Sequence, residues 1–396
     1  MPATVRFGVD RLCDDPSLLH GATRVGLVTN DAARLARNVG SRSRVALLGA
    51  GVPLVRLFGP EHGLTAVADD GAAVSDGFDA ETQLPVISLY GERTRPEAQS
   101  LRDLDALLFD IPDVGTRCYT YTWTLYNAMA ACAETGTRLV VLDRPNPLGG
   151  DLSCAEGPML DLAHRSFLGE AVIPLRHQVT LGELATLWQH EQFPDASLTV
   201  IPCAGWTRAM RWSDCALPWV PTSPAMPEFA SAELYPGICL FEATNLSVGR
   251  GTDAPFRQIG APWVDSSVVA RCFLQHHVAG VTIDEVSFTP TIAPYAGEVC
   301  YGVRLKLTDA NAARPVAIGL LLLAAISQTH REHFAWARYP TAANRTGEGH
   351  FERLIGRGDV RAVFDAASES IDGWAVRRWT ATGDWADRVC AVLRYE

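Results

Sequence analysis

The hexapeptide FGPEHG, residues 58–63, places two side chains that can transfer protons next to each other, Glu61 and His62. It follows the mostly apolar run VPLVRL, residues 52–57, which predicts a buried strand. Glycine and proline are turn residues, so Gly59 and Pro60 would end that strand and turn the chain. A polar turn without chemistry has the same composition, but a carboxyl group beside an imidazole at a strand end also fits acid–base catalysis.

Polar side chains that could bind a substrate also follow other predicted strands. They stand at or just after the ends of these strands: Asn30, Asp110, Asp113, Arg117, Tyr121, Asp143, Arg144 and Asn146. In an open parallel sheet, ligands bind outside the carboxyl ends of the strands, so we expect these side chains to lie at one edge. Each could instead be an ordinary turn residue, but their occurrence at successive strand ends favours a site.

Alternating strands and helices must position these residues. Apolar runs predict strands at residues 24–30, 54–58, 86–90, 106–111, 138–143 and 198–202. Amphipathic stretches at 123–135 and 181–190 predict helices, and Thr180 with Glu183 forms a capping box for the second. Strands that are apolar throughout and alternate with helices predict an α/β protein with a doubly wound, mostly parallel sheet.

A second, smaller α/β domain is predicted after residue 262. Residues 281–291 and 300–308 alternate as strands do, and 315–328 predicts a buried helix begun by a proline. We therefore expect a catalytic domain over residues 1–262 and a smaller domain over residues 263–396. Residues 218–262 are dense in Pro, Gly, Asn and Thr and predict long ordered loops.

Composition argues against several classes of protein. The 396 residues carry a net charge of −11, which argues against a nucleic-acid partner. The one lysine, Lys306, is not in a Gly-Lys-Ser/Thr phosphate loop, and no G-x-G-x-x-G, H-E-x-x-H or Cys-x-x-Cys motif occurs. We therefore expect neither a cofactor nor a metal. The N-terminus lacks signal-peptide features and no apolar run could span a bilayer, so we expect a cytoplasmic protein without membrane contact; a homodimer is left open.

A polar cleft with carboxylates, aromatic rings and arginines, and without a cofactor motif, suits a carbohydrate substrate. Sugars pack on aromatic faces and exchange hydrogen bonds with Asp, Asn and Arg. Cleavage of a glycoside needs two carboxyl groups beside the bond, one of which stays protonated and acts as the acid.

Eight motifs stand in a fixed order along the chain: FGPEHG, FDIPDVGTRCYTY, VLDRPNPLGG, EGP, TLGELA, LPW…SPAMP, YPG…EATNLSVGRGT and IGAPW. In this order they resemble the NamZ-type exo-β-N-acetylmuramidases, and the resemblance covers nearly the whole chain. It implies a Rossmann-like domain that carries the active-site cleft, with a smaller C-terminal domain beside it. It also implies removal of terminal N-acetylmuramic acid from the non-reducing end of peptidoglycan fragments, without a cofactor.

The resemblance implies catalytic roles for two glutamates. Glu61 of FGPEHG is the leading catalytic carboxylate, and Glu156 of EGP is favoured for the second carboxyl role. Three aspartates are rivals for that second role: Asp110, Asp113 and Asp143. The acetamide of the substrate itself is a further alternative.

The lactyl carboxylate of muramic acid suits an arginine fork, for which Arg117, Arg144 and Arg250 are the candidates. The whole set of expected substrate-binding residues is His62, Asn30, Asp110, Asp113, Arg117, Tyr121, Asp143, Arg144, Asn146, His177, Glu242, Asn245 and Arg250.

The sequence departs from the family pattern at Ala225 and Val248, where Asn and Glu are usual. These changes remove polar groups from a loop that we expect to face the cleft. Two other functions remain open on the same scaffold. One is a non-catalytic binder of muropeptides, and the other is a sugar isomerase that uses Glu61 and His62 as a proton-transfer pair.

Overall fold

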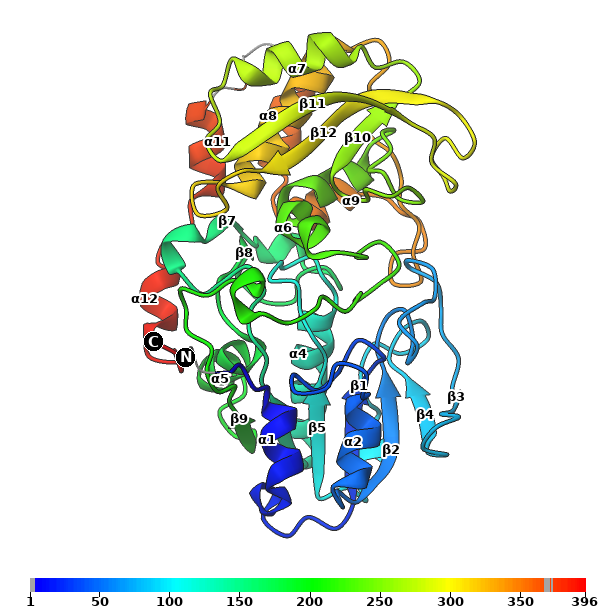
Figure 1. Ribbon diagram of the computed structural model, residues 1–396, viewed down its shortest axis with the longest axis vertical. Coiled ribbons are helices and arrows are strands. Elements are labelled where there is room, and N and C mark those ends of the chain that lie inside the picture. Colours follow the sequence, from blue (N-terminus) through cyan, green and yellow to red (C-terminus); the bar gives the residue numbers. More distant parts are fainter. Residues whose placement is uncertain (1–3, 367–370, 372) are drawn as a thin grey trace.

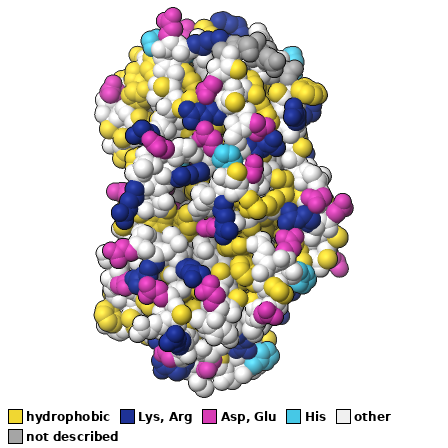
Figure 2. All heavy atoms as spheres, turned by 180° about the vertical axis from the view of Figure 1, so that it is seen from behind, with side chains coloured by type: hydrophobic (Ala, Val, Ile, Leu, Met, Phe, Trp, Pro, Cys, Tyr) yellow, Lys and Arg dark blue, Asp and Glu magenta, His cyan; other side chains and the backbone are white. Residues whose placement is uncertain are grey.

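The computed structural model describes residues 4–366, 371 and 373–396. The chain folds into two parts stacked along the long axis of the molecule, a lower part around β1–β6 and an upper part around β10–β12 (Figure 1). No helix among the described residues is long and apolar enough to cross a membrane. On the face that Figure 2 shows, acidic and basic side chains are interspersed rather than gathered by sign.

The lower part is built on a seven-stranded sheet of order β3-β4-β2-β1-β5-β6-β9. Six of its strands are parallel to their neighbours: β1 (Val25–Thr29), β2 (Leu54–Gly59), β4 (Pro85–Ser88), β5 (Ala106–Asp110), β6 (Arg138–Leu142) and β9 (Leu198–Ile201). The short β3 (Gly77–Phe78) pairs antiparallel with β4 at the edge. The six parallel strands follow the Rossmann order 3-2-1-4-5-6, so the predicted fold class and strands are confirmed.

Helices cover both faces of this sheet, because alternate residues of its strands enter two separate cores. In β5, Leu108 lies in one core, whereas Leu107 and Phe109 lie in the other. The helices on the face of Leu108 are α1 (Gly8–Asp14) and α2 (Ser43–Gly49), and those on the opposite face are α3 (Ala98–Leu101), α4 (Tyr121–Thr135) and α5 (Leu181–Glu191). The predicted capping box of Thr180 and Glu183 begins α5.

The upper part contains an antiparallel sheet of order β10-β12-β11, formed by Gln258–Ala261, Cys300–Leu307 and Val281–Phe288. Its first helices are α6 (Phe229–Ile238), α7 (Ser266–Leu274) and α8 (Pro315–Thr329). The remaining helices of this part are α9 (His350–Ile355), α10 (Asp359–Ala366) and α11 (Gly373–Thr380). Helix α12 (Trp385–Cys390) lies beside the lower part, where Arg388 pairs with Glu191 of α5 (Figure 1). Helices α6 and α8 touch through glycines, since a Cβ on Gly237 would lie 1.9 Å from the carbonyl oxygen of Pro315.

The expectation of long loops over residues 218–262 is met at residues 218–228 and 244–257 and is wrong for the rest. This stretch contains α6, a short 3-10 helix at Cys239–Ala243 and strand β10. Pro236 lies inside α6, where a proline normally breaks a helix. Burial of Leu234 and Ile238 in the core shared with α8 outweighs that local cost. The expected domain boundary at residue 262 stays a prediction, although β10 before it pairs with β12 after it.

Candidate active site

A cleft lies between the strand-end loops of the lower part and residues of the upper part. The lower part contributes Glu61 and His62 after β2, Tyr90 after β4 and Thr120 before α4. The upper part contributes side chains from four places in the chain: Glu242, Arg250, Tyr339 and His350. Since no single segment forms this cleft, it depends on the packing of the two parts.

Glu61 is held on the wall of this cleft by a tight turn after β2. The backbone of His62 is left-handed, with φ of 64°, and the amide of Gly63 donates to the carbonyl oxygen of Pro60 at 3.0 Å. Oε2 of Glu61 accepts from the hydroxyl of Thr120 at 2.6 Å, and Oε1 accepts from the amide of Gly71 at 3.1 Å. The turn thus presents a fixed carboxyl group to the cleft.

The surroundings of Glu61 favour its protonated form. Only 5% of the residue is exposed. Burial raises the pKa of Glu61, and the neighbouring charge of Asp70 raises it further, whereas His62 and the Thr120 hydroxyl act in the opposite direction. A carboxyl group kept protonated near neutral pH can act as a general acid.

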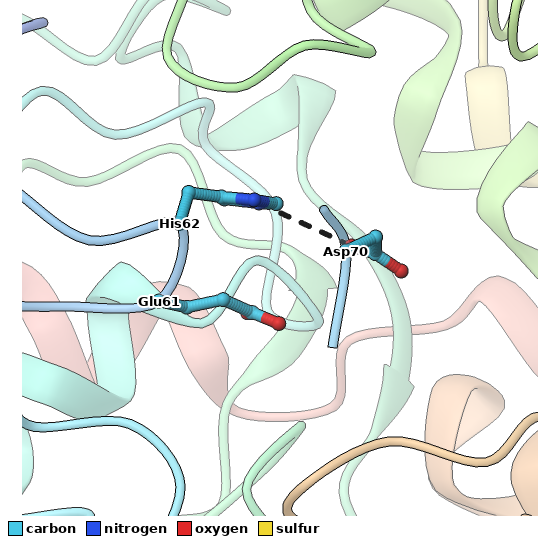
Figure 3. A group of neighbouring side chains, drawn as sticks. All are labelled: Glu61, His62 and Asp70. Atoms are coloured by element: carbon cyan, nitrogen blue, oxygen red, sulfur yellow. Dashed lines mark ion pairs between the residues drawn. The ribbon is translucent and has the colours of Figure 1, made fainter. Parts of the chain in front are cut away.

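His62 and Asp70 stand beside Glu61, as Figure 3 shows, and His62 points toward Asp70. Nδ1 of His62 donates to the carbonyl oxygen of Ala68 at 2.8 Å, which leaves Nε2 at 4.0 Å from Oδ1 of Asp70. Burial opposes the charge of Asp70, but Arg250 and the Tyr339 hydroxyl overcome it and lower the pKa of this carboxyl. The pKa values of these two neighbouring carboxyl groups are therefore shifted in opposite directions, up for Glu61 and down for Asp70.

Glu61, His62 and Asp70 are also the one group of described side chains whose atoms lie close enough to hold a metal ion, within 4.8 Å of one another. A cation there would need Glu61 in its ionised form. Without a cation, the surroundings described above oppose that form.

Glu242 and Arg250 form a partly buried ion pair on the opposite wall. Nε and Nη2 of Arg250 donate to Oε1 of Glu242 at 2.9 and 2.6 Å, and Nη2 lies 3.5 Å from Oδ2 of Asp70. The guanidinium group also stacks over the ring of Phe256 at 4.9 Å. Burial raises the pKa of Glu242 to about 7, although Arg250 lowers it. The positive charge of Arg250 is shared between Glu242 and Asp70, since both carboxyl groups lie beside it.

The raised pKa of Glu242 predicts a pH dependence of stability. A carboxyl group with a higher pKa in the folded than in the unfolded protein stabilises the fold at low pH, and this contribution is lost as the pH rises through the folded pKa. For Glu242 this stabilisation should be lost between about pH 4.5 and about pH 7. The variant Glu242→Gln should lack this pH dependence of the free energy of unfolding. Urea unfolding of both proteins across this range measures the effect. A difference between them that is independent of pH would contradict it.

Four of the residues expected to bind or act on the substrate line the cleft: Glu61, His62, Glu242 and Arg250. Two more lie directly behind its wall. Nδ2 of Asn30 donates to the hydroxyl of Tyr121 at 2.9 Å, and that hydroxyl donates to the carbonyl oxygen of Thr222 at 2.8 Å. Tyr121 packs edge-on against Tyr119, a residue of the cleft, with 4.9 Å between ring centroids. Asn30 and Tyr121 therefore support the wall.

The other residues expected to bind the substrate do not line the cleft, because they bind one another or the backbone. Arg144 makes a buried pair with Asp110 at 2.7 Å, and Nε2 of His177 lies 3.3 Å from Asp113. The remaining four contact backbone: Asp143 accepts from Gly182, Asn146 donates to Val179, Asn245 donates to His333, and Arg117 donates to Pro158, Ile173 and Leu354. These contacts tie loops together.

Glu156, which we favoured for the second carboxyl role, also lies outside the cleft. It begins β7 (Glu156–Met159), which pairs with β8 (Pro174–Arg176). Its carboxylate accepts from the backbone amides of Val316 and Ala317 in the first turn of α8, and lies 3.6 Å from Nη1 of Arg176. A carboxylate at a helix N-terminus stabilises that helix, so this contact strengthens the start of α8.

Sequence reasoning missed several residues of the cleft, namely Asp70, Tyr90, Tyr339, His350 and Arg353. Asp70 follows GPEHG in the same loop, so its charge and position were available as a signal. The last three come from the far end of the chain, where no strand-end pattern marks them.

Comparisons with known proteins show which family the chain resembles. The family description "Exo-beta-N-acetylmuramidase NamZ, N-terminal" matches residues 25–230, and its C-terminal counterpart matches residues 233–384. The chain belongs to the NamZ family. A relative named peptidoglycan β-N-acetylmuramidase NamZ, from Bacillus subtilis, is 40% identical over 363 residues, which are 91% of this chain and 84% of the relative. The resemblance predicted from the motifs is confirmed.

Two solved structures of DUF1343 family proteins from Bacteroides fragilis have the same fold. One superposes with a TM-score of 0.87 at 29% identity and covers 99% of both chains. The other has a TM-score of 0.73 at 27% identity and covers 100% of this chain and 99% of its own. These values support the arrangement of the two parts around the cleft.

The loops that carry two departures from the NamZ pattern face the cleft as expected, through Ser223, Met226 and Arg250, but the departing residues themselves do not. Ala225 and Val248 are both buried in the main hydrophobic core, and neither lines the cleft. An apolar side chain suits such a place, since a buried amide or carboxylate would need a hydrogen-bonding partner there.

Proposed function

We propose that this protein hydrolyses the glycosidic bond of a terminal, non-reducing β-N-acetylmuramic acid in peptidoglycan fragments, with Glu61 as the general acid. The observation that carries this proposal is a buried carboxyl group with a raised pKa on the wall of a cleft, beside the charged Asp70. Membership of the NamZ family and the 40% identical muramidase from Bacillus subtilis support the choice of substrate.

The geometry allows a simple division of work. Protonated Glu61 donates its proton to the glycosidic oxygen while the bond from that oxygen to the anomeric carbon breaks. The ionised Asp70 stabilises the positive charge that develops at the anomeric carbon. Glu61, then ionised, accepts a proton from the water that completes hydrolysis. Thr120 and Gly71 hold the Glu61 carboxyl group in place throughout.

The test compares two chromogenic substrates that differ only in the lactyl ether, 4-nitrophenyl β-N-acetylmuramide and the matching N-acetylglucosaminide. We expect nitrophenol from the muramide and none from the glucosaminide. Release from neither, with muramyl disaccharide still binding in calorimetry, would overturn hydrolysis in favour of a binding protein. A product of unchanged mass would indicate an isomerase instead.

The cytoplasmic location and the homodimer stay predictions, which cell fractionation and light scattering can test.

A further inference from the structure

Two arginines line the cleft, and they differ in their partners. Arg250 is bound to Glu242 and lies near Asp70. Arg353, in helix α9, makes no side-chain hydrogen bond or ion pair with any residue that the structure describes. A guanidinium group has five N–H donors, so one that faces a cleft without a partner is available to a ligand.

Arg353 has no acidic partner in the cleft. Three acidic side chains line the cleft, and two of them, Asp70 and Glu242, pair with Arg250. None of the three, Glu61 included, makes an ion pair with Arg353 in the part of the chain that the structure describes. A ligand with one negative charge would supply the missing partner.

A second unpartnered group stands one helical turn from Arg353. His350 is only 6% exposed and lines the same cleft, but its Nδ1 has no hydrogen-bond partner. The imidazole ring is fixed in place, because it stacks on Tyr339 with 4.6 Å between ring centroids. Residues three apart lie on one face of a helix, so His350 and Arg353 can contact the same ligand.

We propose that Arg353 and His350 form the subsite for the carboxylate of the lactyl ether of N-acetylmuramic acid. Of the three arginines suggested by sequence, Arg117 and Arg144 lie outside the cleft, and Arg250 already holds two carboxyl groups. A planar guanidinium binds a carboxylate through two parallel hydrogen bonds. This inference rests on the proposed function, and it assigns to α9 the selection of muramic acid over N-acetylglucosamine.

The test uses Arg353→Ala and two substrates, the chromogenic muramide and the methyl ester of its lactyl group. A hydrogen bond to a charged group contributes about 1.5–3 kcal/mol, so kcat/KM for the carboxylate substrate should fall about 10- to 100-fold. The value for the neutral ester should change less than about twofold.

His350→Phe keeps an aromatic ring stacked on Tyr339 but removes the nitrogens, and it should show a smaller, equally selective loss. Arg357→Ala, which removes an exposed pair with Asp359, is the control and should change neither value.

Equal losses on both substrates, or no loss on the carboxylate, would overturn the subsite. Arg353→Lys keeps the charge and guards against misfolding, and it should recover part of the selectivity. Calorimetry with free N-acetylmuramic acid tests the inference separately from catalysis. If the wild type binds this sugar but does not hydrolyse the muramide, the proposed function fails. The subsite then stands if Arg353→Ala weakens binding about tenfold or more, and falls if it does not.

Discussion

Glu61→Gln should lower kcat/KM on a muramyl disaccharide by about 10²–10⁴-fold, which is the usual contribution of a general acid. Glutamine has nearly the same shape but cannot donate a proton to the glycosidic oxygen. The fold should survive, because the glutamine side chain can still hydrogen bond to the hydroxyl of Thr120 and the amide of Gly71.

The leaving group distinguishes loss of an acid from loss of binding. Dinitrophenolate is a weak base and leaves the sugar without help from a proton. Glu61→Gln should therefore be far less impaired on a dinitrophenyl muramide than on the disaccharide. Glu134→Gln, which changes an exposed glutamate paired with Arg95, is the matched control and should leave both rates unchanged. Equal losses of the Glu61 variant on both substrates would contradict the acid role.

Arg250→Met should reduce the free energy of unfolding by about 3–5 kcal/mol, the usual result of removing one partner from a buried ion pair. The change leaves Glu242 and Asp70 without their shared cation. Because an ionised carboxylate without a partner is the costly species, the loss should be larger above about pH 7 than near pH 5, where protons can neutralise it. Urea unfolding at both pH values measures this.

An exposed arginine–glutamate pair is the control for that experiment. Arg95 and Glu134 are about half exposed, with 48% and 57% of their side chains accessible. Arg95→Met should therefore cost no more than about 1 kcal/mol, with little dependence on pH. A small, pH-independent loss for Arg250→Met as well would show that the cleft does not rely on this pair for its charge balance.

The fold could be predicted from the sequence because its strands are buried on both faces. Runs such as residues 106–109 are apolar throughout, as strands of a doubly wound sheet must be, and their order along the chain gives the Rossmann pattern. The capping box of Thr180 and Glu183 could also be predicted, because its two residues are close together in the sequence. Helix α6 was missed because its proline and glycine signal a loop, whereas its burial against α8 depends on residues about 80 positions away.

The site could be predicted only in part, because the strand-end rule gives an edge of the sheet and not a cleft. Asp110 and Arg144 follow central strands, but they neutralise each other at the switch point between β1 and β5. The cleft instead lies beyond β2 and β4, where Glu61 and Tyr90 meet residues of the upper part. Which distant residues cover those strand ends follows from tertiary packing, so no local pattern could indicate Arg353.

The measurement that tests the central claim most directly is analysis by mass spectrometry of the products from a natural substrate, N-acetylmuramic acid β-linked to N-acetylglucosamine. Wild type and Glu61→Gln should be compared in parallel. We predict that the wild type releases both free sugars in equal amounts, with one water consumed for each disaccharide cleaved. The variant should release almost none. An unchanged disaccharide with both proteins, or equal release by both, would contradict an acid-catalysed muramidase built on Glu61.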